Sequence, residues 1–264
     1  MSQFELTDKV AIVTGGGGAS HGIGSCIAQT LASAGAKVVV VGRNQAPLDQ
    51  VVSEIKSQGG EAISVIADVT DPTAVDNMVE QVKAAMGRID ILVNSAGGSS
   101  FGNPEDITPE DWSACLAFNL NGTFFCSAAV AKEMIAQQSG KIINIGSSSG
   151  IKGEEHAAHY AAAKAAIINL TRSLAISWAI HNINVNCVSP GSVEVPDHDV
   201  PDMPEDEHAK RQKLQSVQGG NALGLPGKPQ DIANSVVFYA SAGSDGLTGE
   251  NLVVRGSEWA SAYA

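Results

Sequence analysis

The stretch VTGGGGASHGIGSCIA, Val13 to Ala28, decides the fold because it puts a glycine-rich turn between a strand pattern and a helix pattern. In turns of this kind, one glycine permits the tight bend and another lets the backbone approach a pyrophosphate. The N-terminus of the following helix attracts the anion. A plain flexible turn is the alternative, but the position after the first strand favours a nucleotide-binding turn.

The glycine turn can be read in two registers. In one, Gly18, Gly22 and Gly24 take the required spacing, and the glycines from Gly15 onward form an insertion after the strand. In the other, Gly15 is the turn glycine and the loop is longer. The sequence does not choose between them. The residues expected to hold the cofactor phosphates are Gly15, Gly18, Ser20, His21, Gly22, Ile23 and Gly24.

The end of the second strand indicates which nucleotide binds. Proteins that prefer NAD usually have an acidic residue there, which binds the ribose hydroxyls. This strand ends in VVVVGRN, so Gly42 stands in that place and Arg43 follows. A guanidinium binds a 2′-phosphate in a fork, so we expect NADP(H) to be preferred, with contacts from Arg43 and Asn44, and NAD(H) to be the alternative cofactor. Arg43 stacked on adenine or turned to solvent is the other reading.

Short apolar runs alternate with helical patterns along the whole chain. This order predicts an α/β fold: a doubly wound, Rossmann-like parallel sheet with helices on both faces, in one domain over residues 1–264. Helix starts are expected at Asp71-Pro72, at Thr108-Pro109 and at Pro229. About seven strands are predicted, at residues 9–14, 37–41, 62–67, 89–94, 141–146, 183–188 and 250–254.

Composition excludes several classes of partner. The net charge of −12 argues against nucleic acid and against an anionic membrane surface. The N-terminal residues lack a signal-peptide pattern, and no apolar run is expected to span a bilayer. The scattered cysteines fit buried, reduced thiols and no metal site is expected, so we predict a cytoplasmic protein. These cysteines are Cys26, Cys115, Cys126 and Cys187.

Tyr160 and Lys164 are the first candidates for chemistry. They lie four residues apart in a helical pattern, so their side chains share a face. A neighbouring ammonium and an oxidised nicotinamide are expected to lower the phenol pKa, and the tyrosine could then exchange a proton with a carbonyl or alcohol. Ser147 ends a strand and could hold the substrate oxygen. A chance pair on a helix surface is the plainer alternative.

At this point the chain resembles the short-chain dehydrogenase/reductase family in its compact single-domain form. The resemblance covers nearly all of the chain and rests on motifs in a fixed order. They are the glycine turn, Asp68-Val69, Asn94-Ser95-Ala96-Gly97, Asn119 in FNLNGTF, Ser147, Tyr160 with Lys164, and Ser189-Pro190-Gly191.

The resemblance implies four catalytic residues. Tyr160 would be the acid/base, Lys164 would bind the nicotinamide ribose and lower the tyrosine pKa, and Ser147 would orient the carbonyl. Asn119 would hold a water that links Lys164 to solvent; a polar residue that kinks a helix is the alternative. The cofactor cleft would be lined by Asp68, Val69, Asn94, Ala96, Gly97, Pro190, Gly191 and Val193.

The segment 191–222 is expected to form a substrate flap. Its run from Glu194 to Glu207 holds seven acidic residues and no Lys or Arg. A solvated surface loop explains them, but acids facing the cleft would repel phosphates, coenzyme A and acidic carrier proteins. Four polar residues before Tyr160 are read as loop, or else as pocket lining: Glu154, Glu155, His156 and His159.

We therefore predict an oxidoreductase for a small or medium uncharged ketone or secondary alcohol. A 3-oxoacyl-carrier-protein reductase and a non-catalytic nucleotide-binding protein are the alternatives. The presence of all four catalytic residues argues against the last. By resemblance, a homo-oligomer, dimer or tetramer, is expected through the helices near 109–136 and 158–180, with no nucleic acid and no membrane as partners.

Overall fold

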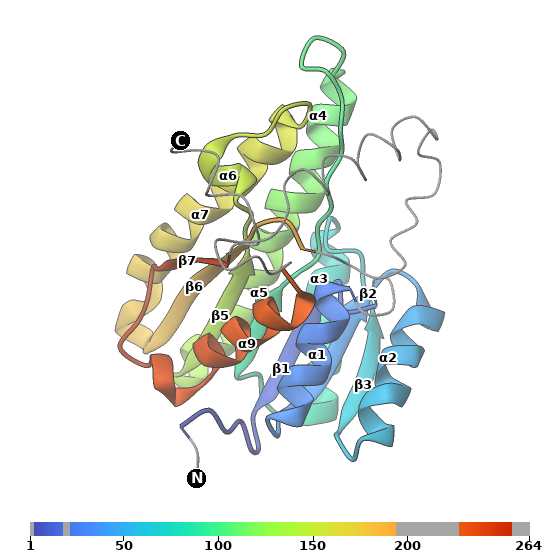
Figure 1. Cartoon of the computed structure of the whole chain (residues 1–264). Coiled ribbons are helices and arrows are strands. Elements are labelled where there is room, and N and C mark those ends of the chain that lie inside the picture. The colour runs from blue at the N-terminus through green and yellow to red at the C-terminus, as the bar shows by residue number, and fades with distance from the viewer. Residues whose placement is uncertain (1–2, 18–21, 194–226, 255–264) are drawn as a thin grey trace.

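The computed structural model describes residues 3–17, 22–193 and 227–254. Its strands form one parallel sheet in the order β3-β2-β1-β4-β5-β6-β7, which confirms the predicted fold class (Figure 1). The bounds are β1 Val10–Thr14, β2 Lys37–Gly42, β3 Ala62–Ile66, β4 Ile91–Asn94, β5 Gly140–Ile145, β6 Ile183–Pro190 and β7 Asn251–Val254.

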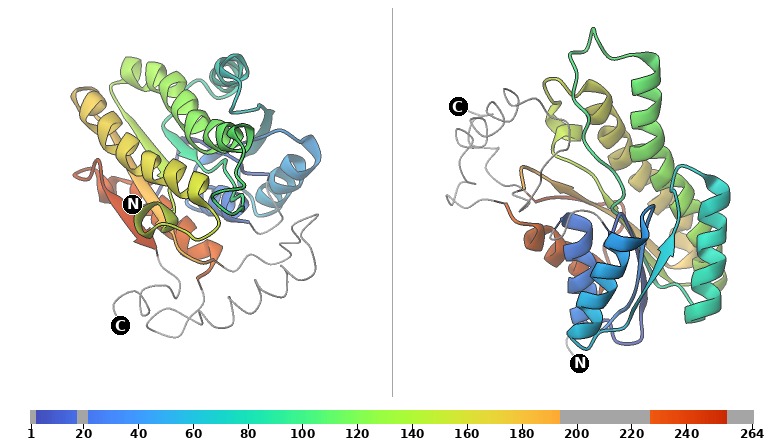
Figure 2. Two further views of the ribbon diagram at one scale, coloured as in Figure 1. Left: turned by 90° about the horizontal axis from the view of Figure 1, so that it is seen from above. Right: turned by 90° about the vertical axis from the view of Figure 1, so that its right-hand side faces the viewer.

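Helices cover both faces of the sheet because the strands are apolar on both sides. In β1, Ala11 and Val13 join one core cluster, whereas Val10 and Ile12 join the other. The first cluster lies under α1 (Ile23–Ser33), α2 (Gln45–Ser57) and α9 (Pro229–Ala240). The second lies under α3 (Pro72–Met86), α5 (Gly122–Gln137) and α7 (Ala158–Trp178), and Figure 2 shows the two layers of helices.

Shorter elements lie where the strands end or the long helices bend. They are α4 (Pro109–Leu116), a π-helical turn η1 (Ala117–Asn121), α6 (Ser149–Lys152), and the 3₁₀ turns η2 (Ala179–His181) and η3 (Ala242–Ser244). The labels α4 and α6 stand at the carboxyl edge of the sheet in Figure 1, opposite the N-terminus. Ligands of open α/β sheets bind at that edge.

The predicted helix starts are confirmed in detail. Asp71 accepts a hydrogen bond from the Thr73 amide, and Pro72 is the first residue of α3. Thr108 and Asp111 form a reciprocal capping box at the start of α4. Pro229 opens α9. Each cap satisfies amides that have no partner inside the helix, which is why these short motifs predict helix starts well.

Two strand boundaries differ from the prediction by two residues, and the other boundaries differ by at most one. Strand β4 begins at Ile91, two residues late, because the backbone of Ile89 pairs with the Gln137 side chain instead of with a strand. Strand β6 continues to Pro190, because β7 pairs with it along its last four residues. The alternation of apolar residues does not reveal either contact.

The continuous helix of α4, η1 and α5 corrects one expectation. In the described part of the chain, it alone is long and apolar enough to cross a membrane, and half of its most apolar stretch is buried inside the protein. It packs against α3 and α7 over the sheet, as a core helix does. The four cysteines form no disulfides. The expected flap lies outside the described residues beyond Val193.

Candidate active site

The glycine turn after β1 is packed too closely to admit side chains. Gly15 has a φ of +69°, and a Cβ there would lie 2.8 Å from the Cα of Ala96. A Cβ on Gly24 would collide with the Gly15 carbonyl, so the start of α1 sits directly against the turn. Gly15 thus occupies the tight bend, and Gly22 is the N-cap of α1 before Ile23. Gly18, Ser20 and His21 lie outside the described residues.

A cavity of about 240 Å³ opens beside this turn. It lies between the ends of β1, β2 and β4, where a dinucleotide would place its adenosine half. Its walls combine the turn with several of the residues expected at the cofactor. They include Gly15, Gly17, Gly42, Arg43, Asn44, Asp68, Val69, Ala96 and Gly97. The narrow glycine-lined wall and the helix N-terminus beside it fit a nucleotide phosphate.

Arg43 faces this cavity from the end of β2. Its guanidinium lies 5.4 Å from the centre of the Phe118 ring. The amide and hydroxyl of Thr70 donate to Asp68 and, with a smaller contribution from Arg43, hold the pKa of that carboxyl below its usual value. Arg43 therefore lines the cavity and remains exposed to solvent, and its contact with a cofactor phosphate stays a prediction.

Thr14 is a residue that the sequence analysis missed. Its hydroxyl accepts hydrogen bonds from the amides of Ser95 and Ala96, both 3.1 Å away. These bonds fix the segment after β4 that lines the cavity. Asn94 lies below that segment, where its buried side chain donates to Ser127 and Asn144. The sequence signal that could have identified Thr14 is a small polar residue at the end of a run that predicts a buried strand.

Ser147 and Tyr160 meet at the carboxyl edge of β5. Their hydroxyls are hydrogen-bonded, and the Ser149 amide donates to the Ser147 oxygen at 3.1 Å. The bond from Ser149 occupies a lone pair of the Ser147 oxygen, so the single Ser147 proton is the one donated to the Tyr160 oxygen. Burial raises the pKa of Tyr160, and the bond from Ser147 opposes the rise. The sequence analysis expected a lowered pKa for Tyr160, and the protein alone does not produce that lowering.

Lys164 is a buried cation one helical turn from Tyr160. Its Nζ lies 5.6 Å from the centre of the Tyr160 ring and donates to the Ile145 carbonyl at 2.9 Å. Burial lowers the lysine pKa to about 8. An ammonium with one carbonyl partner remains poorly compensated, which is typical of a functional group.

Asn119 occupies the π-helical turn η1, and that turn aims it at the β4 loop. Its Oδ1 accepts from the Gly98 amide, and its Nδ2 donates to the carbonyls of Gly98 and Cys115, each at 3.1 Å. A Cβ on Gly97 would lie 2.8 Å from Asn119 Oδ1 and 3.3 Å from Lys164 Nζ. The missing side chain of Gly97 therefore lets Asn119 and Lys164 approach the same point.

A chain of buried side chains supports Asn119 from below. The Thr123 hydroxyl donates to the Asn119 carbonyl at 3.0 Å, and the Ser127 hydroxyl donates to the Thr123 carbonyl at 2.7 Å. Asn94 continues the chain from Ser127 to Asn144, whose amide donates to Thr171 on α7 at 3.0 Å. The chain joins the kinked helix to the helix that carries Tyr160. Sequence analysis missed Thr123, Ser127 and Thr171.

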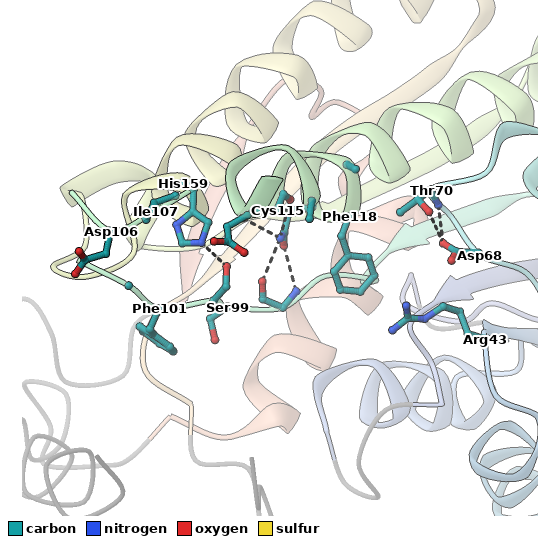
Figure 3. Close-up of a pocket in the computed structure, with 17 residues that line it drawn as sticks. Arg43, Asp68, Thr70, Ser99, Phe101, Asp106, Ile107, Cys115, Phe118 and His159 are labelled. Carbon is teal, nitrogen blue, oxygen red and sulfur yellow. Dashed lines mark hydrogen bonds between the residues drawn. The ribbon is translucent and has the colours of Figure 1, made fainter. Parts of the chain in front are cut away.

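A larger cavity of about 700 Å³ extends past Asn119 (Figure 3). Arg43, Asp68 and Phe118 lie at one end of it, and His159 and Asp106 at the other. His159 is 2% exposed, and its Nε2 lies 2.6 Å from the Ser100 hydroxyl. Of the four polar residues before Tyr160, His159 thus lines a cavity. Glu155 and His156 lie at the surface.

The end of β6 and the residues after it border the carboxyl edge of the sheet beside β5; they are Pro190, Gly191 and Val193. The Ser148 amide donates to the Pro190 carbonyl at 2.8 Å, and the Gly191 amide donates to the Val254 carbonyl at 2.8 Å. Val193 forms a bridge with Gly227, on the far side of the undescribed segment. These bonds bring the end of β6 next to the strand that presents Ser147, as the sequence implied.

Comparison with known proteins agrees with this arrangement. The family model for short chain dehydrogenases matches residues 9–203. A 2,3-dihydro-2,3-dihydroxybenzoate dehydrogenase of Bacillus subtilis is 37% identical, with 97% of this chain and 98% of that protein covered. A 3-oxoacyl-[acyl-carrier-protein] reductase of a Synechocystis species is 38% identical, with 95% and 97% covered.

A solved structure extends the likeness to the fold. It is a 3-oxoacyl (acyl-carrier-protein) reductase from Agrobacterium tumefaciens C58 with NADP bound. It superposes with a TM-score of 0.85 at 29% identity, with 96% of this chain and 95% of that chain covered. The sheet order, the glycine turn and the matches together place the protein: it belongs to the short-chain dehydrogenase/reductase family and is an oxidoreductase of that family.

Proposed function

We propose that the protein is an NADP(H)-preferring reductase or dehydrogenase for a small or medium uncharged ketone or secondary alcohol. One observation carries this proposal. The Ser147 hydroxyl, the Tyr160 phenol and the Lys164 ammonium converge at the carboxyl edge of β5, and Asn119 borders Lys164 across Gly97. This is an acid/base group next to a hydrogen-bond donor, at the place where a ligand of this fold lies.

Each residue has a distinct task in the proposed reaction. Ser147 turns its hydroxyl proton from the Tyr160 oxygen to the substrate oxygen and so orients the carbonyl. Tyr160 gives a proton to that oxygen in reduction and removes it in oxidation. Lys164 holds positive charge beside the phenol ring, which favours the phenolate. Asn119 anchors the β4 loop next to Lys164 through both bonds to Gly98.

The residues present fit a nicotinamide dinucleotide. The glycine turn leaves room for phosphate, and Gly97 leaves open the space beside Lys164 and Asn119. When bound, the cofactor would supply or accept the hydride, and its oxidised form would add a positive charge beside Tyr160. Residues Gly15, Arg43, Asn44, Asp68, Val69, Ala96 and Gly97 would hold its adenosine half, and Lys164 its nicotinamide ribose.

The first experiment is a titration of the protein with NADPH and with NADH, followed by nicotinamide fluorescence. We expect tighter binding of NADPH, because Arg43 faces the cavity and Gly42 carries no competing acid. Arg43→Ala should remove about tenfold or more of that preference, as loss of a charge-assisted phosphate contact does. Equal binding of both cofactors by the wild type would refute the NADP(H) preference. Lys56→Ala, on the far end of α2, is the matched control.

A 3-oxoacyl-carrier-protein reductase is the second candidate, because two of the matched proteins carry that name. The acidic residues of this chain count against a docking partner that is itself acidic. Reduction of a 3-oxoacyl carrier protein with a kcat/KM above that of the free N-acetylcysteamine thioester would favour it. Equal or lower efficiency on the carrier protein would favour the small-molecule reading.

We further propose a cytoplasmic homo-oligomer, a dimer or tetramer, formed through α4, α5 and α7. The four unpaired cysteines agree with that compartment. Phe124 on α5 and Ile176 on α7 are 43% and 79% exposed, which is unusual for large apolar side chains on core helices. Light scattering of the wild type should give a multiple of 27.1 kDa. A monomeric mass at micromolar concentration would remove the proposal, and Ile176→Lys should lower the mass.

A further inference from the structure

The segment between Ser147 and Tyr160 brings a carboxylate to the reacting groups. Helix α6 packs against α7 at Lys164, so closely that a Cβ on Gly150 would lie 2.6 Å from the Ala165 amide nitrogen. The chain then turns at Gly153, which has a φ of +80° and carries nothing within 4 Å of its Cβ position. Glu154 follows this turn. Its place is therefore fixed relative to the helix that carries Tyr160.

Two hydrogen bonds connect Glu154 with Ser147. The Ser149 hydroxyl donates to Glu154 Oε2 at 2.8 Å, and the Ser149 amide donates to Ser147 Oγ at 3.1 Å. Among the described residues, Oε1 of Glu154 has no hydrogen-bond partner. Burial is the main cause of the raised pKa of Tyr160, the hydrogen bond from Ser147 opposes it, and the charge of Glu154 is the smallest of the contributions that raise this pKa, after that of Cys115.

Lys152 does not cancel this charge. Its Nζ lies 3.7 Å from Glu154 Oε2, but the two side chains are 39% and 33% exposed. Ion pairs as exposed as this one are screened by water and contribute little. The neighbouring Glu155 offers a contrast, because its side chain is 87% exposed and lies beside His156. Of the two adjacent glutamates, Glu154 is thus the one bonded to Ser149, the residue whose amide contacts Ser147.

We infer that Glu154 selects the substrate: it repels anionic substrates and accepts a hydrogen bond from a hydroxyl on a neutral one. This inference rests on the proposed function and deepens it. An anion held next to Ser147 and Tyr160 would be repelled by the negative charge of Glu154, which borders Ser147 through Ser149. A substrate hydroxyl would instead find Oε1 as an acceptor.

The test compares pairs of related substrates in which one member carries a carboxylate and the other carries a neutral group in its place. D-Glucitol and D-gluconate are oxidised with NADP⁺, and ethyl 3-oxobutanoate and 3-oxobutanoate are reduced with NADPH. The wild type should have the higher kcat/KM on the neutral member. Glu154→Gln should narrow that ratio about tenfold, the effect of removing one nearby charge from a partly exposed site. Glu154→Asp should restore most of the ratio, and Glu155→Gln, the control, should leave it unchanged.

A second readout separates selection from a general loss of structure. Removing the negative charge favours the phenolate, so the pH inflection attributed to Tyr160 should move to lower pH by roughly half a unit in Glu154→Gln. Glu155→Gln should not move it. An unchanged ratio and inflection in Glu154→Gln, or equal changes in Glu155→Gln, would overturn the inference.

The variant Tyr160→Phe distinguishes a failure of the proposed function from a failure of the inference about Glu154. If the wild type turns over one of the four compounds and Tyr160→Phe does not, the proposed function stands, and the Glu154 variants then decide the inference alone. If Tyr160→Phe is as active as the wild type, or if none of the compounds reacts, the proposed function fails, and the selection inferred for this site falls with it.

Discussion

The two edges of the sheet differ in how well each one compensates a buried charge. At the amino edge, Asp90 is 5% exposed and fully paired: Arg88 donates two hydrogen bonds to it, at 2.6 and 2.8 Å, and the Val10 amide donates a third. At the carboxyl edge, Lys164 is 4% exposed and has one carbonyl partner. A fully compensated charge supports the fold, whereas a poorly compensated one is available for chemistry.

The largest effect should come from removing the acid/base at the carboxyl edge. Tyr160→Phe should lower kcat about 10³-fold, the usual contribution of a positioned general acid. NADPH affinity and melting temperature should change little, because the ring remains and only the bond with Ser147 is lost. Steady-state kinetics and a cofactor titration on the same preparation would check this. A loss below tenfold would mean that another group moves the proton.

At the amino edge, a substitution should lower the stability of the protein and not its kcat. Asp90→Ala removes the acceptor of three hydrogen bonds and should lower the free energy of unfolding by about 3 kcal/mol, as breaking a buried pair does. Its kcat should stay near the wild-type value. Urea denaturation measures the change. Glu61→Ala, which breaks the exposed pair with Lys37, is the control and should cost less than about 1 kcal/mol.

Replacing Lys164 should raise the free energy of unfolding, whereas replacing Asp90 should lower it. The pKa of Lys164 is about 8 in the folded protein and 10.5 in the reference state, so the unfolded chain binds more protons between those values, and the buried ammonium costs stability below pH 8. Lys164→Met should therefore raise the free energy of unfolding at pH 6.5 by about 2 kcal/mol, after the lost bond to Ile145 is subtracted. The gain should vanish above about pH 10.5. Thermal melts at both pH values test it, and destabilisation at pH 6.5 would contradict it.

The smallest effect should come from the polar chain below Asn119. Thr123→Val removes the hydroxyl that donates to the Asn119 carbonyl and should lower kcat a few-fold, because the loosened turn holds the β4 loop less firmly. KM should change less than kcat. Thr123→Ser keeps the hydroxyl and should restore most of the rate. Kinetics of the two variants side by side measure this, and equal rates would show that the hydroxyl does not account for the effect.

These contrasts also explain what could be read from the sequence. The seven strands were predicted because long β-branched runs buried on both faces leave a strong signal, and VVVV in β2 is the clearest case. Tyr160, Lys164 and Ser147 were found because catalytic side chains have fixed types and spacing. Their convergence in the structure agrees with those assignments, and the catalytic roles themselves remain predictions.

Other features depend on contacts between distant segments. Asp90 stands in the run IDILVN, where its charge reads as an interruption, and the hydrogen bond that it accepts from the Val10 amide, 80 positions away in the sequence, shows only in three dimensions. The register of the glycine turn depends on how closely Gly15 approaches Ala96, 81 positions further along the chain. A linear pattern contains none of these distances.

The π-helical turn at Ala117–Asn121 has a consequence for how the gene can change. A π-turn holds one residue more than the α-helical turn it replaces. Deleting one residue of this segment other than Asn119 would let α4 and α5 join in a regular helix. The same deletion would rotate the side chain of Asn119 away from Gly98. The length of this segment should therefore be far less free to vary than its composition.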